Sequence, residues 1–400
     1  MMTRVLVTIG SYLPGYKAGG PIRSVANLID ALGDGFKFHV VTSDRDLGGD
    51  KPYDNIIRGS WQSVGKAKVL YLSPADMNLV KWYRLLNSNS YDLLYLNSYF
   101  CQLTVKTLFL RALGLIPKKP AIVAPRGEFS TAAFSMGRLK RFKKQMYIHL
   151  AGTLDFYRQV TWQASSEKEM SDILVRLGNR ICAQQILVAP DIPNMGTLQA
   201  GLANNAIVED RIDSKRPGFA RVVFLSRIAK MKNLKMAIEL LGEVKGEIEF
   251  DIYGPQEDKE YWNRCREAVR QLPPNVRVCY KGIVPAERVH EVFSRYHLFL
   301  FPTLGENYGH VIPEALGAGC LVLTSDRTPW QSFDKDGIGW TVPLHECGRF
   351  VNAIDEIIDM DSEEFVWRSE KAIVFAKQVA TNEAVIEANR ALFNQALRLS

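Results

Sequence analysis

Short apolar runs alternate with helical segments along this 400-residue chain, a pattern typical of proteins with buried parallel sheets. At the start, the strand-like run RVLVTIG leads into the glycine-rich SYLPGYKAGGPI and then into RSVANLIDALG, whose helical spacing ends at Gly33. Further strand-like runs are FKFHVVTS, DLLYLNS and AIVAP, separated by helical segments around KWYRLLN and LTVKTLFLRALG. This alternation predicts a first Rossmann-like unit of parallel strands and helices.

The pattern breaks at APDIPNMGTLQAGLANNAIVEDRIDSKRPG, where proline, glycine, asparagine and charged residues cluster with little periodicity, as in a linker. It then resumes with the strand-like runs ARVVFLSRI, IEFDIYGP, VRVCYKGI, HLFLFPT and CLVLTS, which predict a second Rossmann-like unit. The segment KQVATNEAVIEANRALFNQALRL near the end reads as one helix. A chain of this length favours two domains.

Composition and charge narrow the classes of function. The chain has no run of 18 or more apolar residues, so we expect no segment that spans a bilayer. The start, MMTRVLVTIG, goes straight into a strand-like run, so we expect no signal peptide. The six cysteines are scattered and read as reduced thiols. Residues 1–196 carry 25 Lys and Arg against 14 Asp and Glu, a net charge of +11, whereas the remainder carries −4. The basic half therefore favours an anionic partner, although no interleaved aromatic and basic pattern indicates nucleic acid.

Two glutamates, Glu306 and Glu314, lie eight positions apart in PTLGENYGHVIPEALGAG. This spacing occurs four times in the chain, so it means little alone. Here it follows a buried strand and flanks a helix start, with Pro313 in the first turn, where a missing N–H costs nothing. The backbone amides near Gly309–Val311 predict an anion site, beside which a carboxylate suits sugar hydroxyls. A helix cap with a surface glutamate is the alternative.

Two further segments suit a diphosphate. In LSRIAKMKNL, Arg227 and Lys232 follow the end of a strand. The guanidinium of arginine can bind a phosphate through two parallel hydrogen bonds, and the ammonium of lysine can bind it as a single positive charge. A solvated charge run is the alternative. In YKAGGPIRS, Gly19 and Gly20 precede a helix and allow close approach of a ligand, although the segment is neither G-x-G-x-x-G nor a P-loop.

Together these segments resemble the retaining, family 4 glycosyltransferases (glycosyl transferases group 1) of bacterial surface-polysaccharide type, over nearly the whole chain. The segment PTLGENYGHVIPEALGAGCLVLTSDRTPW is similar to the family's E-x7-E region, and LSRIAKMKN to its Arg/Lys segment. GYKAGGP is similar to its glycine loop and APRGEFS to an Arg-Gly segment of many bacterial members. Four motifs in the right order are more specific than any one of them.

The resemblance implies the α/β GT-B fold, with two facing Rossmann-like domains, a cleft between them and a C-terminal helix that returns to the N-terminal domain. Residues 1–192 would bind the acceptor and residues 193–376 the nucleotide sugar, and residues 377–400 would form the returning helix. The implied activity is transfer of a hexose from a nucleotide-diphosphate sugar to a glycan or polyprenyl-diphosphate-linked acceptor. No cofactor and no metal are implied, since the nucleotide sugar is the substrate.

The resemblance also implies residue roles. Arg227 and Lys232 would neutralise the leaving diphosphate, and Glu306 would hold hydroxyls of the transferred sugar. These three are the catalytic candidates, because the departing phosphate itself takes the acceptor's proton and no protein base is required. Glu314 would accept hydrogen bonds from the donor's ribose. The other donor-binding residues that the resemblance implies are Gly19, Gly20, Tyr308, Gly309, His310 and Val311.

One departure from the family concerns a cleft histidine that many members carry after an N-terminal strand, roughly where this chain reads LYLNSYF. Asn97 or Ser98 stands there instead, so the role of that histidine does not transfer. Asn97 and Arg126 are candidate contacts to the sugar or the acceptor. The pattern D-x-D occurs three times, close to chance, and does not indicate a manganese site.

A basic amphipathic segment, SMGRLKRFKKQMYIHL, places Leu139, Phe142, Met146 and Leu150 on one helical stripe. With the net charge of the first half, it favours peripheral binding to an anionic membrane on the cytoplasmic face. A core stripe with a solvated basic face is the alternative. For the whole chain, the alternatives are a non-hydrolysing nucleotide-sugar epimerase and an inactive nucleotide-sugar-binding protein. A nicotinamide dehydrogenase is disfavoured because its fingerprint is absent.

Overall fold

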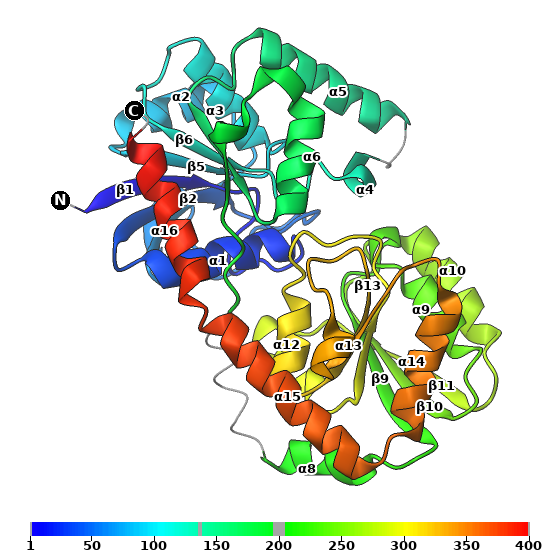
Figure 1. Cartoon of the computed structure of the whole chain (residues 1–400). Helices are drawn as coiled ribbons and strands as arrows, with labels where there is room; N and C mark the ends of the chain where they lie inside the picture. Colours follow the sequence, from blue (N-terminus) through cyan, green and yellow to red (C-terminus); the bar gives the residue numbers. More distant parts are fainter. Residues whose placement is uncertain (1, 135–137, 195–204, 399–400) are drawn as a thin grey trace. The chain divides into compact units, whose positions relative to one another are not determined.

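The computed structural model describes residues 2–134, 138–194 and 205–398. The chain divides into two compact units, Met1–Ile192 with Glu383–Ser400 and Pro193–Asn382 (Figure 1). Each unit has a largely parallel sheet with helices packed against it. None of the described helices combines the length and apolar character needed to cross a membrane.

The sheet of the first unit has the strand order β3-β4-β2-β1-β5-β6-β7-β8. Its strands are β1 (Thr3–Thr8), β2 (Phe36–Ser43), β3 (Trp61–Val64), β4 (Ala67–Leu72), β5 (Leu93–Asn97), β6 (Ala121–Ala124), β7 (Val160–Ala164) and β8 (Ile186–Val188). The edge strand β3 is antiparallel to β4, and all the other pairs are parallel. Since parallel strands end at the same edge, the segments that follow β1, β5, β6 and β7 lie near one another.

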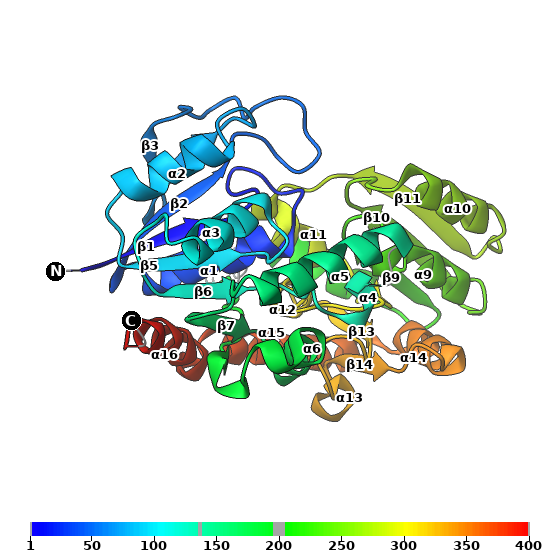
Figure 2. The same cartoon turned by 90° about the horizontal axis from the view of Figure 1, so that it is seen from above.

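Helices cover both faces of this sheet. They are α1 (Gly20–Leu32), α2 (Leu79–Ser88), α3 (Gln102–Ala112), α4 (Thr131–Phe134), α5 (Arg138–Thr153), α6 (Glu167–Leu177) and α16 (Glu383–Arg398), with short turns η1 (Gly178–Arg180) and η2 (Ala183–Gln185). The helices α1 and α16 pack side by side over one core, and α2, α3 and α6 cover the other. Figure 2 shows α6 beside β7.

The second unit has a parallel sheet in the order β11-β10-β9-β12-β13-β14. Its strands are β9 (Phe219–Leu225), β10 (Glu247–Tyr253), β11 (Val276–Gly282), β12 (Leu298–Phe301), β13 (Leu321–Ser325) and β14 (Gly339–Val342). Every residue of β12 and β13 is buried, as expected for strands covered on both faces. Those strands deliver their following loops to one edge, where the candidate residues lie.

The helices of this unit form two groups. Its helices and turns are α8 (Asn205–Ser214), η3 (Lys230–Lys232), α9 (Leu234–Leu241), α10 (Lys259–Arg270), η4 (Ala286–Arg288), α11 (Val289–Phe293), α12 (Val311–Gly317), α13 (Phe333–Asp336), α14 (Cys347–Asp359) and α15 (Ser362–Ala380). The helix α9 packs with α10 and α14, whereas α12 packs with α11 and α15. The predicted pair of Rossmann-like units, with a C-terminal helix on the first unit, is therefore confirmed.

Two details of the sequence analysis were wrong. The single helix expected over residues 377–400 is two helices, because α15 ends at Ala380 and α16 begins at Glu383. The division between the units falls in this break, after Asn382. The expected linker is helical over Asn205–Ser214, because tertiary contacts hold that segment: Arg211 is buried and donates to the carbonyl of Ala318 (2.7 Å). The central part of that linker, residues 195–204, lies outside the described residues.

Candidate functional site

A buried ion pair lies at the carboxyl edge of the second sheet. The Nζ atom of Lys232 is 2.5 Å from Oε1 of Glu306, and the two side chains are 13% and 10% exposed. Thr303 donates from its hydroxyl to the same carboxylate oxygen at 3.0 Å. The structure therefore brings together two of the three predicted catalytic residues: the cation of Lys232 and the carboxylate of Glu306, which can accept hydrogen bonds from sugar hydroxyls.

Local contacts explain why Lys232 and Glu306 meet. The strands β9 and β12 are neighbours, with Phe299 opposite Val223, so their following loops leave the sheet together. Lys232 is the last residue of the 3-10 turn η3, and Asn233, which follows it, adopts the left-handed conformation (φ 58°) that asparagine tolerates. The side chain of Asn233 donates to the carbonyl of Pro302 (2.9 Å), which ties the two loops to each other.

The segment between the two glutamates turns into α12. Gly309 has a φ of 80°, where a side chain would be strained and its Cβ would lie 3.2 Å from Ile312. The helix α12 begins at Val311, and Pro313 lies in its first turn, as predicted. Glu314 is buried, and Glu306 is nearly so. The alternative of a helix cap with a surface glutamate is therefore wrong.

Aromatic packing fixes the residues just before α12. The ring of Tyr308 lies 4.7 Å from the ring of His310 and 5.2 Å from the ring of Trp330. Tyr308 and His310 are both buried. A buried histidine of this kind has a packing role, whether or not it also contacts a ligand.

Arg227, the third catalytic candidate, has a different partner. Its guanidinium lies 2.9 Å from the carboxylate of Glu257, in the loop that follows β10, and its side chain is one-third exposed. Gly254 allows that loop to approach, because a Cβ at this residue would lie 1.9 Å from the carbonyl oxygen of Ser226. A diphosphate bound here would have to share Arg227 with Glu257 and Lys232 with Glu306.

In the first unit, the candidate residues also lie at the carboxyl edge of their sheet. Gly19 has a φ of 68° and Gly20 begins α1, with Pro21 in the first turn, so the glycine pair forms the predicted loop-to-helix junction. Asn97 ends β5, and Arg126 follows β6. Register places Asn97 opposite Ala124, two residues before Arg126.

Arg126 is the centre of a buried polar network. Its guanidinium donates to Oδ1 of Asn97 at 2.9 and 3.1 Å and to the hydroxyl of Tyr95 at 2.6 Å. It forms an ion pair with Asp191, and both of those side chains are only 4% exposed. The other carboxylate oxygen of Asp191 accepts from the hydroxyl of Ser24 in α1 (2.9 Å). Arg126 therefore holds the ends of β5 and β6, the helix after the glycine loop, and the chain at residue 191.

The network leaves one donor without a partner. Because arginine has only donors, Asn97 must turn its carbonyl oxygen towards Arg126 and its amide nitrogen away. That nitrogen is buried and has no acceptor among the described residues. It is the one atom of Asn97 that could donate to a ligand.

Two acids lie near this edge: Glu169, which is buried, and Glu128, which is partly exposed. Glu128 accepts from the backbone N–H of Phe100 at 3.0 Å, yet burial raises the pKa of Glu128 to about 7. Glu169 accepts from the N–H of Gly127 and of Ser165, and burial also raises its pKa. Glu169 therefore holds the backbone of the Arg-Gly segment, and Glu128, which belongs to that segment, ties it to the backbone after β5.

Sequence reasoning missed several of these partners. Thr303, Glu257 and Asp191 each complete an interaction of a candidate residue. Thr303 lies in the E-x7-E segment itself, where nothing marked its hydroxyl, and Glu257 and Asp191 come from loops without a pattern of their own. Only Asn233 carries a usable signal, as an asparagine at a turn before a helix. Among the described residues, no three His, Cys, Asp or Glu side chains gather as a metal site.

Comparisons with known proteins match this architecture. Residues 208–372 match the model of the family Glycosyl transferases group 1. No curated protein sequence matches the chain.

Solved structures resemble the chain along its whole length. HepE from Anabaena, solved in complex with UDP and glucose, shares 16% identity over 98% of this chain and 99% of its own, with a TM-score of 0.66. Sucrose-phosphate synthase from Thermosynechococcus elongatus shares 14% over 100% of both chains, with a TM-score of 0.69. WaaG, a glycosyltransferase involved in lipopolysaccharide biosynthesis, shares 14% over 95% of this chain and 98% of its own, with a TM-score of 0.65.

At these identities the structural likeness establishes the fold alone. The match to the glycosyl transferases group 1 lies within the second unit, and the chain as a whole has the GT-B fold.

Proposed function

We propose that this chain is a retaining, metal-independent glycosyltransferase, and that it moves a hexose from a nucleotide-diphosphate sugar to a glycan or polyprenyl-diphosphate-linked oligosaccharide in surface polysaccharide biosynthesis. The enzyme would act in the cytoplasm, at the inner face of the cell membrane. HepE has been solved with UDP-glucose, and WaaG is involved in lipopolysaccharide biosynthesis, so both relatives support this class of substrate and pathway.

The observation that carries the proposal is the buried pair of Lys232 and Glu306. A surface charge run would leave both side chains in water, but here each is close to 90% buried. Burial of a charged pair costs free energy unless the geometry is good, so such pairs are weak evidence for stability. A catalytic use explains why the pair is kept at the edge of a sheet where ligands of α/β proteins bind.

The chemistry follows from the charges. When a nucleoside diphosphate leaves, negative charge grows on the bridging oxygen and positive charge on the sugar. Lys232 and Arg227 would stabilise the diphosphate, while Glu306 would hold hydroxyls of the transferred sugar. Glu314 would accept hydrogen bonds from the ribose. The candidate residues of the first unit would serve the diphosphate (Gly19 and Gly20) and the sugar or acceptor (Asn97), with Arg126 fixing the orientation of Asn97.

The test is a transfer assay with UDP-glucose, which is the first donor to try because HepE binds it. Lys232→Ala and Arg227→Ala should each raise the barrier by about 2–4 kcal/mol, on the scale of a lost contact to a developing charge. Lys230→Ala is the matched control, because Lys230 lies in the same turn but is exposed. If Lys232→Ala and Lys230→Ala had equal rates, the diphosphate would not be bound by Lys232.

Product analysis separates transfer from the other activities. A glycosyltransferase releases nucleoside diphosphate only as sugar is joined to the acceptor, or slowly to water. An epimerase would change the nucleotide sugar without any acceptor, and an inactive binding protein would do neither. An isomerised nucleotide sugar in the absence of acceptor would contradict the proposal.

A further inference from the structure

The helix α5 exposes an apolar stripe. Its four members are 53–68% exposed: Leu139, Phe142, Met146 and Leu150. They recur at intervals of three or four residues, so they lie on one face of the helix. Leu154, just beyond the end of α5, extends the stripe and is also exposed.

The stripe is not part of the core of the first unit. The helix packs inwards through a different face, where Ile148 and Ala151 are buried. Lys144 also turns inwards, with Nζ 4.7 Å from the ring centre of Phe100. The alternative of a core stripe with a solvated basic face is therefore wrong. The outward face of α5 is the apolar one.

Positive charge accompanies this apolar face. The sequence of α5, RLKRFKKQMYIHLAGT, contains five Lys and Arg and no Asp or Glu. Arg141 and Lys143 are exposed and flank Phe142. An apolar stripe on a helix without acids suits the interface of an anionic bilayer, where side chains enter the acyl region and cations meet phosphates. A protein partner would more often pair such a helix with its own acids.

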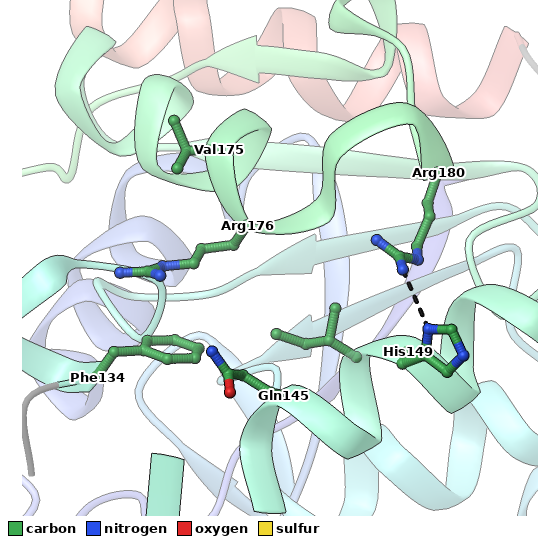
Figure 3. Close-up of a pocket in the computed structure, with 7 residues that line it drawn as sticks. Phe134, Gln145, His149, Val175, Arg176 and Arg180 are labelled. Carbon is green, nitrogen blue, oxygen red and sulfur yellow. Dashed lines mark hydrogen bonds between the residues drawn. The ribbon is translucent and has the colours of Figure 1, made fainter. Parts of the chain in front are cut away.

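A pocket of about 260 Å³ lies beside the stripe (Figure 3). It is lined by Phe134, Gln145, Ile148, His149, Val175, Arg176 and Arg180. In Figure 3 the two arginines enter from α6 and η1, and the guanidinium of Arg180 lies 3.3 Å from Nδ1 of His149. Gln145 and His149 directly precede Met146 and Leu150 of the stripe, so the pocket opens next to the apolar face.

The chemistry of the pocket is that of an anion site with an apolar floor. Arg176 stacks on Phe134 at 4.3 Å, which fixes its position, and it donates to the carbonyl of Phe129 through Nε alone. Neither Arg176 nor Arg180 has an ion pair among the described residues, although Asp172 lies within electrostatic reach of Arg176. The volume is below the range of about 300–1,000 Å³ typical of whole small-molecule ligands, and suits one headgroup.

We propose that α5 and this pocket together form a docking site for an anionic phospholipid membrane. The stripe enters the interface between headgroups and acyl chains, and Arg176 and Arg180 bind the phosphate of one lipid headgroup in the pocket. The inference deepens the proposed function by assigning the residues that meet the membrane. The test measures binding to vesicles and not sugar transfer, so its failure would leave the proposed sugar transfer standing.

The experiment is co-sedimentation of the full chain with vesicles of phosphatidylglycerol or of phosphatidylcholine. Wild-type protein should bind the anionic vesicles more tightly, and the binding should weaken as salt screens the charges. Arg180→Ala should weaken anionic binding about fivefold, the effect of one cation near a charged surface. Phe142→Ser with Met146→Ser should weaken it about tenfold or more, because two large side chains lose their burial.

Matched controls keep the test specific. Leu113→Ser removes an equally exposed leucine (55%) of the same unit, and Arg158→Ala removes an exposed arginine outside the pocket. Both should bind as wild type does. Donor turnover should be unchanged in the docking variants, which shows that they fold.

Three results would overturn the proposal. Equal binding to both kinds of vesicle would mean that the site does not select an anionic headgroup. Binding of inorganic phosphate that depends on Arg180 but does not compete with the anionic vesicles would assign the pocket to free phosphate. Light scattering that shows a dimer dissociated by the Phe142 and Met146 changes would make a second copy of the chain the occupant of the stripe.

Discussion

Arg126 offers the sharpest test of how the first unit holds its candidate residues. Arg126→Leu removes the guanidinium but keeps an apolar side chain at the same place. It leaves the carboxylate of Asp191 without its cation, in a site where both side chains are 4% exposed. It also leaves the oxygen of Asn97 and the hydroxyl of Tyr95 without their donor.

The expected loss is large because these groups are buried. Removing one partner of a buried ion pair costs about 3–5 kcal/mol, most of it from the charge that is left behind. A surface pair in the same unit gives the contrast: Lys66 lies 2.8 Å from Asp34, but the two side chains are 38% and 85% exposed. Lys66→Met should therefore cost no more than about 1 kcal/mol.

Amide hydrogen exchange is the suitable assay, because it reads each unit separately where a single unfolding curve would not. Arg126→Leu should lower protection in β5 and β6 while β10, in the second unit, keeps its own. The double variant with Asp191→Leu should recover part of the loss, since it removes the stranded charge. Asp191→Asn, a milder change, serves if Arg126→Leu does not fold. Equal protection in Arg126→Leu and Lys66→Met would refute the reasoning and leave Arg126 free to contact substrate.

Three further predictions concern single groups. Burial lowers the pKa of His297 to about 3, and its neutral ring accepts from the N–H of Arg221 through Nδ1 (2.9 Å). The stability that this neutral ring gives the second unit should be full above about pH 6.5 and should be lost as the pH falls towards 3. An NMR titration that shows a charged ring near pH 5 would contradict this. The pKa of Glu128 is raised to about 7, so the stability that its protonated form gives the first unit should be full below about pH 4.5 and lost as the pH rises through 7. In urea unfolding at several pH values, Glu128→Gln should abolish that loss of stability. Glu314→Gln should weaken nucleotide binding more than it slows turnover, and an unchanged affinity by calorimetry would count against the ribose role.

Much of the fold could be predicted because buried parallel strands read as unbroken apolar runs. The strands β12 and β13 are such runs, and both were found. The edge strand β3, WQSV, is short, polar and half exposed, so no periodicity marks it. The helix α8 was missed because its stability comes from contacts of Arg211 with residues more than 100 positions away, including Ala318.

The candidate site could be predicted only in part, for a similar reason. Residues that share a motif, such as Glu306 and Glu314, are visible in one segment of sequence. Their partners are set by sheet order, and no local pattern announces that Glu257 will pair with Arg227 or Asp191 with Arg126. The stripe of α5 was visible, but whether it faces the core or the solvent depends on the register of that helix against the sheet.

The return of α16 to the first unit has a consequence for biosynthesis. Leu392, Phe393 and Ala396 complete the core that α1 also covers, and they leave the ribosome only after the whole of the second unit. Until the second unit has been synthesised, α1 alone covers that side of the first sheet in the nascent chain. Premature termination just before Glu383 would spare the residues matched to the family and still yield a protein prone to aggregation.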